Sequence, residues 1–276
     1  YRRNDLFFQI VLKERPIKLV VHDLTKVSSS DQQKFVSDYK KQDLLNKFDL
    51  EKGPLLRLSL IKLDENKHIF ILSFHVIIMD GWCFAFVLSD FYNYYSAFVK
   101  GMKYKPLSRG SYESYVDWLR DQDIQTALKY WGSYLNGFTP QTYVNRDVLK
   151  DTTTDYQVDS VNINIPASLV THVNEISKKS RITLNSLFQT AWAYTLSKLS
   201  SKDTVVIGAT VSGRPPSLEG SDQIIGLFFN DIPIRFKFTE NVDLVEYSKK
   251  IQIDFNTSRQ YEYVTNAQIK DILGLK

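Results

Sequence analysis

Apolar and polar residues follow patterns along this chain that predict strands in its first quarter. Residues 56–63 and 68–74 are rich in Leu, Ile and Phe, and a short polar turn separates them. This pattern predicts an antiparallel hairpin that ends in a loop. Residues 7–12 and 17–22 predict a second hairpin, with Pro16 outside the pairing because proline has no N–H to donate.

Apolar residues at helical spacing predict the next elements. A helix begins near Ser30, whose hydroxyl can cap it, and another spans residues 83–99. Further along, residues 169–178 predict a helix, and residues 183–199 predict one that is capped by Thr183. The apolar sides of these helices are expected to face the core. They are Phe35, Tyr39, Leu44 and Leu45 in the first helix, Phe84, Val87, Leu88, Phe91 and Tyr95 in the second, and Leu184, Leu187, Phe188, Ala191, Trp192, Thr195 and Leu199 in the last.

Two later strands and one stretch without periodicity suggest how the chain is divided. Residues 203–211 and 224–235 each predict a strand. Between residues 138 and 155, periodicity and apolar content both fail, which is typical of a boundary between lobes. The sequence therefore predicts an α/β protein with an N-terminal lobe, residues 1–150, and a C-terminal lobe, residues 151–276.

Composition excludes several classes of protein. The 276 residues are 43% hydrophobic, which is ample for a core, and the net charge is only +4 with both signs interleaved. This balance argues against a nucleic-acid partner. No apolar run approaches the roughly 20 residues that span a bilayer, so we expect a soluble protein with no membrane partner. The single cysteine, Cys83, favours a reducing, cytoplasmic setting.

Neither a metal nor a bound cofactor is expected from the sequence. His22, His68 and His172 are scattered singly, and no phosphate-cradling glycine loop occurs. The chain begins at Tyr1 and stops at Lys276 without the look of natural ends. We therefore expect it to be a fragment.

The candidate active-site loop is residues 75–81, where a His and an Asp five positions apart interrupt an apolar run. Gly81 lets the backbone approach a ligand, because it has no Cβ. Asp80 lies among apolar neighbours, where an unpaired carboxylate is costly, so we expect it to pair with Arg214 across the lobes. The alternative is that Asp80 caps the following helix and Arg214 is solvated.

This loop resembles the signature of the condensation domains of non-ribosomal peptide synthetases, His-His-x-x-x-Asp-Gly at a corner between a strand and a loop. His75, Asp80 and Gly81 match it, and Trp82 follows, but Val76 stands where the family has its second His. The resemblance covers nearly the whole chain and includes further motifs in order. They are Phe48 to Arg57, Tyr112-x-x-Tyr115-x-x-Trp118, Tyr130-Trp131, Ser212-Gly213-Arg214-Pro215 and Ile225 to Asn230.

The resemblance implies two chloramphenicol-acetyltransferase-like lobes in a V-shaped pseudo-dimer, with mixed sheets flanked by helices. It implies an acyltransferase of secondary-metabolite and antibiotic biosynthesis, which joins a donor acyl or peptidyl thioester to an acceptor amine in an amide (peptide) bond. The implied partners are donor and acceptor peptidyl carrier proteins, whose phosphopantetheine arms carry the substrates, and a neighbouring adenylation domain. The domain itself binds no cofactor, and we expect a monomer.

In the family, the second His acts as a base or positioning group for the attacking amine. Val76 has no lone pair or proton for either role. If the strand continues here, His75 and Val76 point to opposite faces, which makes His75 structural. The domain is then naturally silent, deliberately disabled, or reliant on another group, and we expect impaired catalysis. The resemblance assigns catalytic positions to Val76, His75, Asp80 and Gly81, and supporting positions to Arg214, Asn230, Trp82 and Tyr112.

Two alternative functions stay open. A catalytically silent domain would still dock carrier proteins or recruit a partner enzyme. An epimerisation domain shares the signature loop, although the strand at residues 225–230 fits condensation better. A heterocyclisation domain replaces the loop by Asp-x-x-x-x-Asp, and His75 argues against it.

Overall fold

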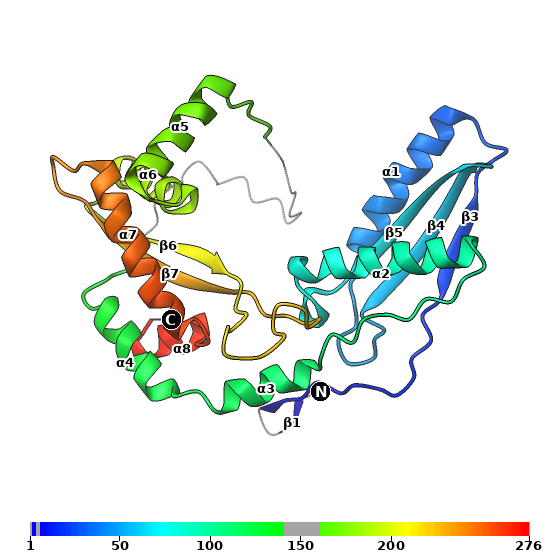
Figure 1. Cartoon of the computed structure of the whole chain (residues 1–276), viewed down its shortest axis with the longest axis horizontal. Coiled ribbons are helices and arrows are strands. Elements are labelled where there is room, and N and C mark those ends of the chain that lie inside the picture. Colours follow the sequence, from blue (N-terminus) through cyan, green and yellow to red (C-terminus); the bar gives the residue numbers. More distant parts are fainter. Residues whose placement is uncertain (1, 4–5, 141–160, 276) are drawn as a thin grey trace. The chain divides into compact units, whose positions relative to one another are not determined.

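The computed structural model describes residues 2–3, 6–140 and 161–275 (Figure 1). The chain forms two compact units. The first comprises residues 1–112 and 220–227, and the second comprises residues 113–219 and 228–276. Each unit combines helices with a small sheet.

The first unit is built on a three-stranded sheet of order β3-β4-β5. β4 (Leu56–Asp64) and β5 (Lys67–Phe74) pair antiparallel, which confirms the predicted hairpin. β3 (Leu19–Asp23) pairs with β4 in parallel, so the prediction of an early hairpin is wrong. The parallel pairing is possible because a helix connects β3 to β4, and parallel strands need such a crossover. At the start of the chain, β1 (Arg2–Arg3) pairs with β2 (Leu6–Phe7).

Helix α1 (Ser29–Leu45) packs on one face of this sheet and is capped by Ser28 rather than Ser30. Its Tyr39 ring centroid lies 4.9 Å from that of His22 on β3, and its hydroxyl lies 2.7 Å from Ser59 Oγ on β4. Leu44, which was expected to face the core, is exposed, and so is Leu45. Because Leu44 comes nine positions after Phe35, it lies on the opposite side of a helix with 3.6 residues per turn.

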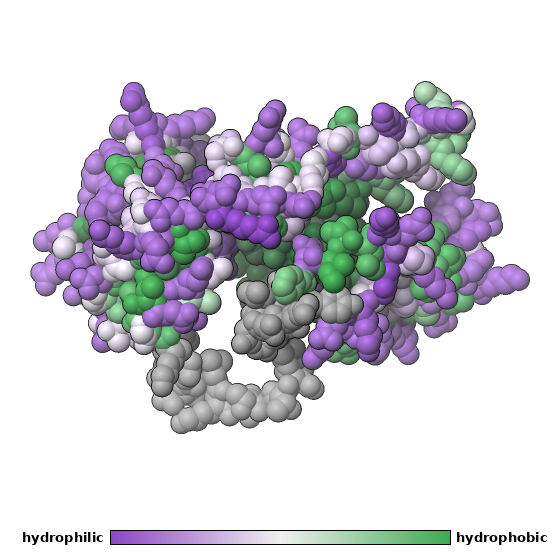
Figure 2. Space-filling model, turned by 90° about the horizontal axis from the view of Figure 1, so that it is seen from below, coloured by the Kyte–Doolittle hydropathy of each residue, from purple (hydrophilic) through white to green (hydrophobic). Residues whose placement is uncertain are grey.

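Helix α2 (Gly81–Val99) follows a single turn of 3₁₀ helix, η1 (Val76–Ile78). Its Phe91 ring stacks on Phe70 of β5 with centroids 4.9 Å apart. Phe70 pairs with Leu60 in the sheet, so it points to the face opposite to Ser59, and α1 and α2 cover opposite faces. The predicted helix is confirmed, but much of its apolar side is exposed, as are other hydrophobic residues of the chain (green in Figure 2).

The second unit is built on a two-stranded antiparallel sheet of β6 (Thr204–Val211) and β7 (Asn230–Lys237). β7 begins only at Asn230, so the prediction of a strand is wrong over residues 224–229. Its core includes the fully buried residues Trp131, Val205, Phe236 and Ile251. The surrounding helices are α3 (Tyr112–Arg120), which starts at the unit boundary, α4 (Ile124–Tyr134), α5 (Ala167–Ser180), α6 (Leu184–Ser200), α7 (Leu244–Ser258), η3 (Arg259–Tyr261) and α8 (Asn266–Ile272).

Helix α6 begins after Thr183, whose side chain accepts from the Ser186 N–H, so the predicted cap is confirmed. The predicted inward face is wrong, because Phe188 and Trp192 are exposed. The buried side consists instead of mostly small residues, which permit close packing. A buried hydroxyl on this side can bind the helix's own backbone. The Thr190 hydroxyl does so, because its Oγ1 donates to the Ser186 carbonyl over 2.9 Å. The buried residues of α6 are Ser186, Thr190, Ala193, Leu196 and Ser197.

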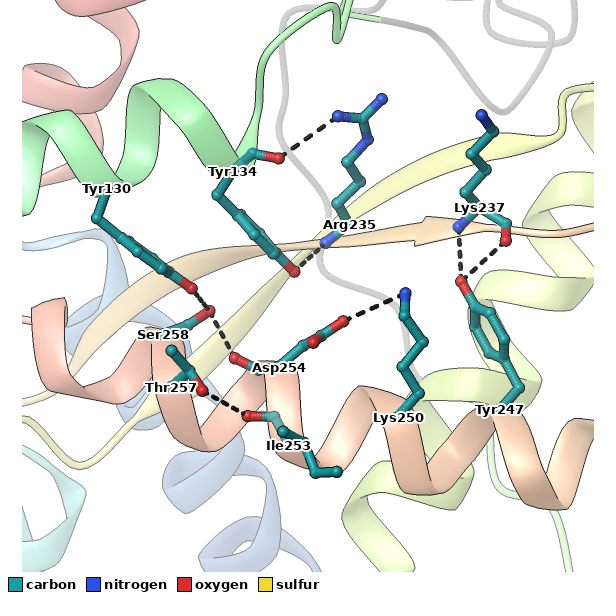
Figure 3. Close-up of polar contacts among 10 residues, drawn as sticks. All are labelled: Tyr130, Tyr134, Arg235, Lys237, Tyr247, Lys250, Ile253, Asp254, Thr257 and Ser258. Carbon is teal, nitrogen blue, oxygen red and sulfur yellow. Dashed lines mark hydrogen bonds and ion pairs between the residues drawn. The ribbon is translucent and has the colours of Figure 1, made fainter.

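Tyrosine hydroxyls from α4 and α7 bind the backbone of β7 (Figure 3). The Tyr134 hydroxyl accepts from the Arg235 N–H over 3.0 Å. The Tyr247 hydroxyl accepts from the Lys237 N–H over 2.7 Å and donates to the Lys237 carbonyl over 3.1 Å. Burial raises the pKa of Tyr134 to about 12, so this hydroxyl stays neutral at physiological pH.

The expected boundary between lobes, within residues 138–155, lies mostly outside the described residues and stays a prediction. The two units do not follow sequence order. Most of α3 and all of α4 belong with the second unit, whereas residues 220–227 belong with the first. A single stretch of low periodicity cannot reveal a chain that crosses between units more than once.

Candidate functional site

The loop after β5 is held by His75. The backbone N–H of His75 donates to the Leu55 carbonyl over 3.0 Å, and its Nδ1 accepts from the Ile77 N–H over 3.2 Å. His75 thereby caps the 3₁₀ turn η1. An Nδ1 that accepts must be unprotonated, so the proton of the neutral ring lies on Nε2. The imidazole also meets the Phe48 ring edge to face, with centroids 6.2 Å apart.

Val76 is the first residue of this turn and is 43% exposed, as is its neighbour Ile77. β5 ends at Phe74, so the expectation that residues 75 and 76 alternate on a strand is wrong. His75 is nevertheless structural, because it caps the turn. Val76 offers an open aliphatic surface that can neither accept nor donate a hydrogen bond.

A polar network beneath the loop supports its start. Arg57 Nε donates to Asp43 Oδ1 over 2.9 Å, and the Ser73 hydroxyl donates to Asp43 Oδ2. The Arg57 guanidinium lies 4.0 Å from the centre of the Phe48 ring, which itself contacts His75. Burial alone would raise the pKa of Asp43, but the hydrogen bonds from Arg57 and Ser73 outweigh burial and lower it. The carboxylate therefore stays charged and ties α1 to both strands that deliver the loop.

Asp80 is only 2% exposed and is the N-cap of α2. Its Oδ1 accepts from the backbone N–H of Cys83 over 3.2 Å, and Cys83 Sγ lies 3.2 Å from the same oxygen. This capping was one of the two roles expected for Asp80. Arg214 lies in the second unit and is 7% exposed, so the idea that it is solvated is wrong. A pairing of Asp80 with Arg214 stays a prediction.

The segment of residues 220–227 packs on the start of α2. Its Gly226 carbonyl accepts from the Asp80 N–H over 3.1 Å and from the Cys83 thiol over 3.3 Å. Trp82 Nε1 donates to the Asp222 carbonyl over 3.1 Å, and the Tyr112 hydroxyl donates to the Leu227 carbonyl over 2.5 Å. The two supporting residues Trp82 and Tyr112 therefore fasten this segment against the loop.

Gly226 is required at its position by crowding, whereas Gly81 is not. A Cβ on Gly226 would lie 2.0 Å from Cδ2 of the Tyr112 ring. A Cβ on Gly81 would meet nothing within 4 Å. No protein atom therefore requires glycine at residue 81. The expectation that Gly81 lets the backbone approach a ligand stays a prediction.

In the second unit, the corner after β6 packs on Phe228. Gly213 has a φ of +61°, and a Cβ there would lie 1.8 Å from the Phe228 carbonyl oxygen. The Arg214 guanidinium lies 4.1 Å from the centre of the Phe228 ring, and the Tyr115 ring centroid lies 4.3 Å from it. Backbone approach and aromatic stacking together fix the direction of Arg214.

Asn230, at the start of β7, binds the backbone after η3. Its Nδ2 donates to the Glu262 carbonyl over 2.7 Å and to the Val264 carbonyl over 2.9 Å. Glu262 was not among the predicted site residues. Its carboxylate accepts from Arg259 Nε over 3.1 Å and from the Gly213 N–H, so it connects this backbone to the corner. Burial outweighs these two interactions and raises the pKa of Glu262. A lone acid between two tyrosines was its only signal in the sequence.

The predicted site residues thus form two groups. His75, Val76, Asp80, Gly81, Trp82 and Tyr112 lie in the first unit, while Arg214 and Asn230 lie in the second. Within residues 6–140 and 161–275, no cluster of His, Cys, Asp and Glu could hold a metal ion. In the same part of the chain, no helix is long and apolar enough to cross a membrane.

Comparison with known proteins identifies the family. A family model described as "Condensation domain" matches residues 1–276. The chain is 31% identical over 268 residues to gramicidin S synthase 2 of Brevibacillus brevis, covering 97% of this chain and 6% of that protein. The chain therefore belongs to the condensation-domain family of non-ribosomal peptide synthetases. It spans only a small fraction of the length of this relative.

Solved structures show the same fold. The first condensation domain of the calcium-dependent antibiotic synthetase, in complex with a substrate analogue, has a TM-score of 0.75 at 16% identity, covering 94% of this chain and 60% of that one. A four-domain nonribosomal peptide synthetase bound to AMP and glycine has a TM-score of 0.72 at 19% identity, covering 95% and 20%. These likenesses confirm the expected α/β fold class.

We predict that Gly226→Ala destabilises the first unit by about 1 to 3 kcal/mol, the usual cost of overpacking. The added methyl would overlap the Tyr112 ring, which cannot swing away without losing its bond to the Leu227 carbonyl. Gly81→Ala is the matched control and should be tolerated. The free energy of unfolding from urea titrations measures both.

In a Tyr112→Ala background, Gly226→Ala should cost much less, because the overlapping ring is gone. An equal cost in both backgrounds would show that Gly226 is constrained by something other than Tyr112.

We predict that Glu262 makes the stability of the protein fall as pH rises. Its raised pKa means that the folded state holds the proton more tightly than the unfolded chain. The stabilisation is complete below the unfolded pKa of about 4.3 and is lost as pH rises through the folded pKa. Glu262→Gln removes this dependence, so the wild type should lose stability relative to the variant as pH rises.

Urea unfolding at several pH values between about 4 and 7 tests this, with Glu219→Gln as the control for loss of an exposed carboxylate. A difference between wild type and Glu262→Gln that is constant with pH, or that changes in the other direction, would contradict the prediction.

Proposed function

We propose that this domain forms an amide bond between a donor thioester and an acceptor amine, and that Val76 slows the reaction. Support comes from the family match over residues 1–276 together with the aliphatic side chain exposed on the turn at residue 76. The donor and acceptor are delivered by carrier proteins on phosphopantetheine arms, in a synthetase that also contains an adenylation domain. The domain works as a monomer in the cytoplasm and binds no cofactor itself.

The chemistry explains why such a site is slowed rather than abolished. An amine attacks a thioester carbonyl only when it is unprotonated and held close to the carbon. Proximity contributes about 7 to 11 kcal/mol, and a positioned base contributes about 10²- to 10⁴-fold in rate. A domain with Val76 keeps the first contribution and loses the second.

His75 does not replace the missing base. Its Nδ1 is occupied by the Ile77 N–H, and the ring packs against Phe48. If Nδ1 acted as a base, it would give up the bond that caps η1, so the turn that presents residue 76 would be loosened. In our proposal His75, Asp80 and Gly81 shape the loop, and the side chain at 76 meets the substrate.

The supporting residues Trp82, Tyr112, Arg214 and Asn230 then keep the segments that carry the site in place. Trp82, Tyr112 and Asn230 each donate a hydrogen bond to a backbone carbonyl within their own unit. The Arg214 guanidinium lies over an aromatic ring of its own unit. The alternative function, a silent platform that docks carrier proteins, is favoured by the same valine. The two differ in whether a base at residue 76 creates activity.

We propose further that Asp80 pairs with Arg214. Asp80→Asn keeps the N-cap, because Asn caps helices as well as Asp, and removes only the charge. A double-mutant cycle of Asp80→Asn and Arg214→Gln should give a coupling of about 1 kcal/mol or more in unfolding free energy. Additive effects would remove the pairing from the proposal.

We predict that Val76→His raises the rate of amide formation about a hundredfold, the low end of the range for a general base. Single-turnover reactions with matched aminoacyl carrier proteins measure this rate. Ile77→His is the control, because Ile77 is equally exposed on the same turn and should produce no gain. Equal, measurable rates for wild type and Val76→His would mean that the chemistry does not depend on residue 76. No amide formation by either form would favour the silent platform.

A further inference from the structure

The end of α2 and the loop after it carry an uncompensated positive charge. Residues 81–112 contain four basic side chains and one acid, Asp90. We call the exposed part of this region the basic apolar surface. It consists of Phe98, Val99, Lys100, Met102, Lys103, Lys105 and Leu107.

The loop that bears this surface is fixed against α2 through Asp90. Arg109 donates to both carboxylate oxygens, from Nη2 over 3.0 Å and from Nε over 3.2 Å. The Tyr104 hydroxyl donates to Asp90 Oδ1 over 3.3 Å, and its ring meets Tyr94 with centroids 4.8 Å apart. The one acid of the region is therefore used inside it.

The three lysines of the surface have no such partner. Lys100, Lys103 and Lys105 are exposed, and within the described residues none of them forms an ion pair. Arg109 and Tyr104 hold the loop at two points, so these lysines project from a backbone that is already ordered. An ordered surface loses less entropy when a partner binds.

Exposed apolar side chains lie among the lysines. Phe98 is 84% exposed and Leu107 is 66% exposed, and Val99 and Met102 are also open to solvent. Along the chain, apolar and basic residues are interleaved rather than segregated. Helices that lie on membranes separate the two kinds on opposite faces, whereas protein interfaces combine apolar anchors with charges around them.

We propose that the basic apolar surface docks the acidic face of a carrier protein. The partner supplies carboxylates to Lys100, Lys103 and Lys105 and apolar side chains to Phe98 and Met102. The inference rests on the proposed function, since it names where a carrier protein binds. The proposed partner is a folded, acidic protein and not a lipid surface.

The test measures binding of the donor and acceptor holo-carrier proteins of the same synthetase, each separately, by isothermal titration calorimetry. The variant Lys100→Glu/Lys103→Glu/Lys105→Glu should weaken one of the two by about tenfold or more at low salt. The effect should shrink at high salt, because exposed charges are screened. Phe98→Ser/Met102→Ser should weaken the same carrier by about fivefold at either salt concentration.

The matched control is Lys26→Glu/Lys34→Glu/Lys41→Glu, which changes the net charge equally at exposed lysines of the same unit. It should change binding by less than about twofold. Circular dichroism and thermal unfolding check that every variant is folded. An equal loss in the control, or no loss in the surface variants, overturns the proposal.

Vesicles of anionic phospholipid provide the other arm. In the contrary result, the wild type binds these vesicles and the triple Lys→Glu variant of the surface fails to bind them, while both bind carrier proteins equally. This result would show a membrane surface and overturn the proposal.

Amide formation by Val76→His separates failure of the docking site from failure of the proposed function. If it proceeds while the surface variants bind carriers normally, only the docking site is wrong. If no carrier protein binds and no amide forms, the proposed function fails as well.

Discussion

The backbone of Gly226 makes the contact on which the candidate loop depends. Its carbonyl accepts from the Asp80 N–H and the Cys83 thiol on one side, while the Tyr112 ring covers the other side. Any side chain at this position would overlap the Tyr112 ring and disturb the packing of the segment of residues 220–227. The first unit thus completes its candidate loop with a segment that lies far along the chain.

This dependence explains why the sequence could indicate candidate site residues but not the contacts among them. The strand before the loop, the helix after it and the motifs at residues 212–215 and 225–230 were recognisable, because each is a local pattern. Glu262 has no local pattern around it. Its role follows from the Gly213 N–H and Arg259, and only the fold brings Gly213 near it.

The same limit applies to the helices. Helical spacing located α2 and α6 and the cap at Thr183, yet it placed the wrong side of α6 in the core. Hydrophobicity alone favoured Phe188 and Trp192, whereas close packing selected Ser186, Thr190 and Ala193. The early strand was also found, but its partner was not, because the choice between a hairpin and a crossover depends on a distant strand.

The tyrosines on β7 have a consequence for how this protein behaves when chains meet. An uncovered strand edge is a template on which another chain can build a sheet, and this is a common start of aggregation. Tyr134 and Tyr247 occupy the backbone groups of Arg235 and Lys237 that would otherwise be offered. At these two residues an incoming strand would have to displace two aromatic rings before it could pair, so growth of the sheet is blocked there by side chains rather than by charge.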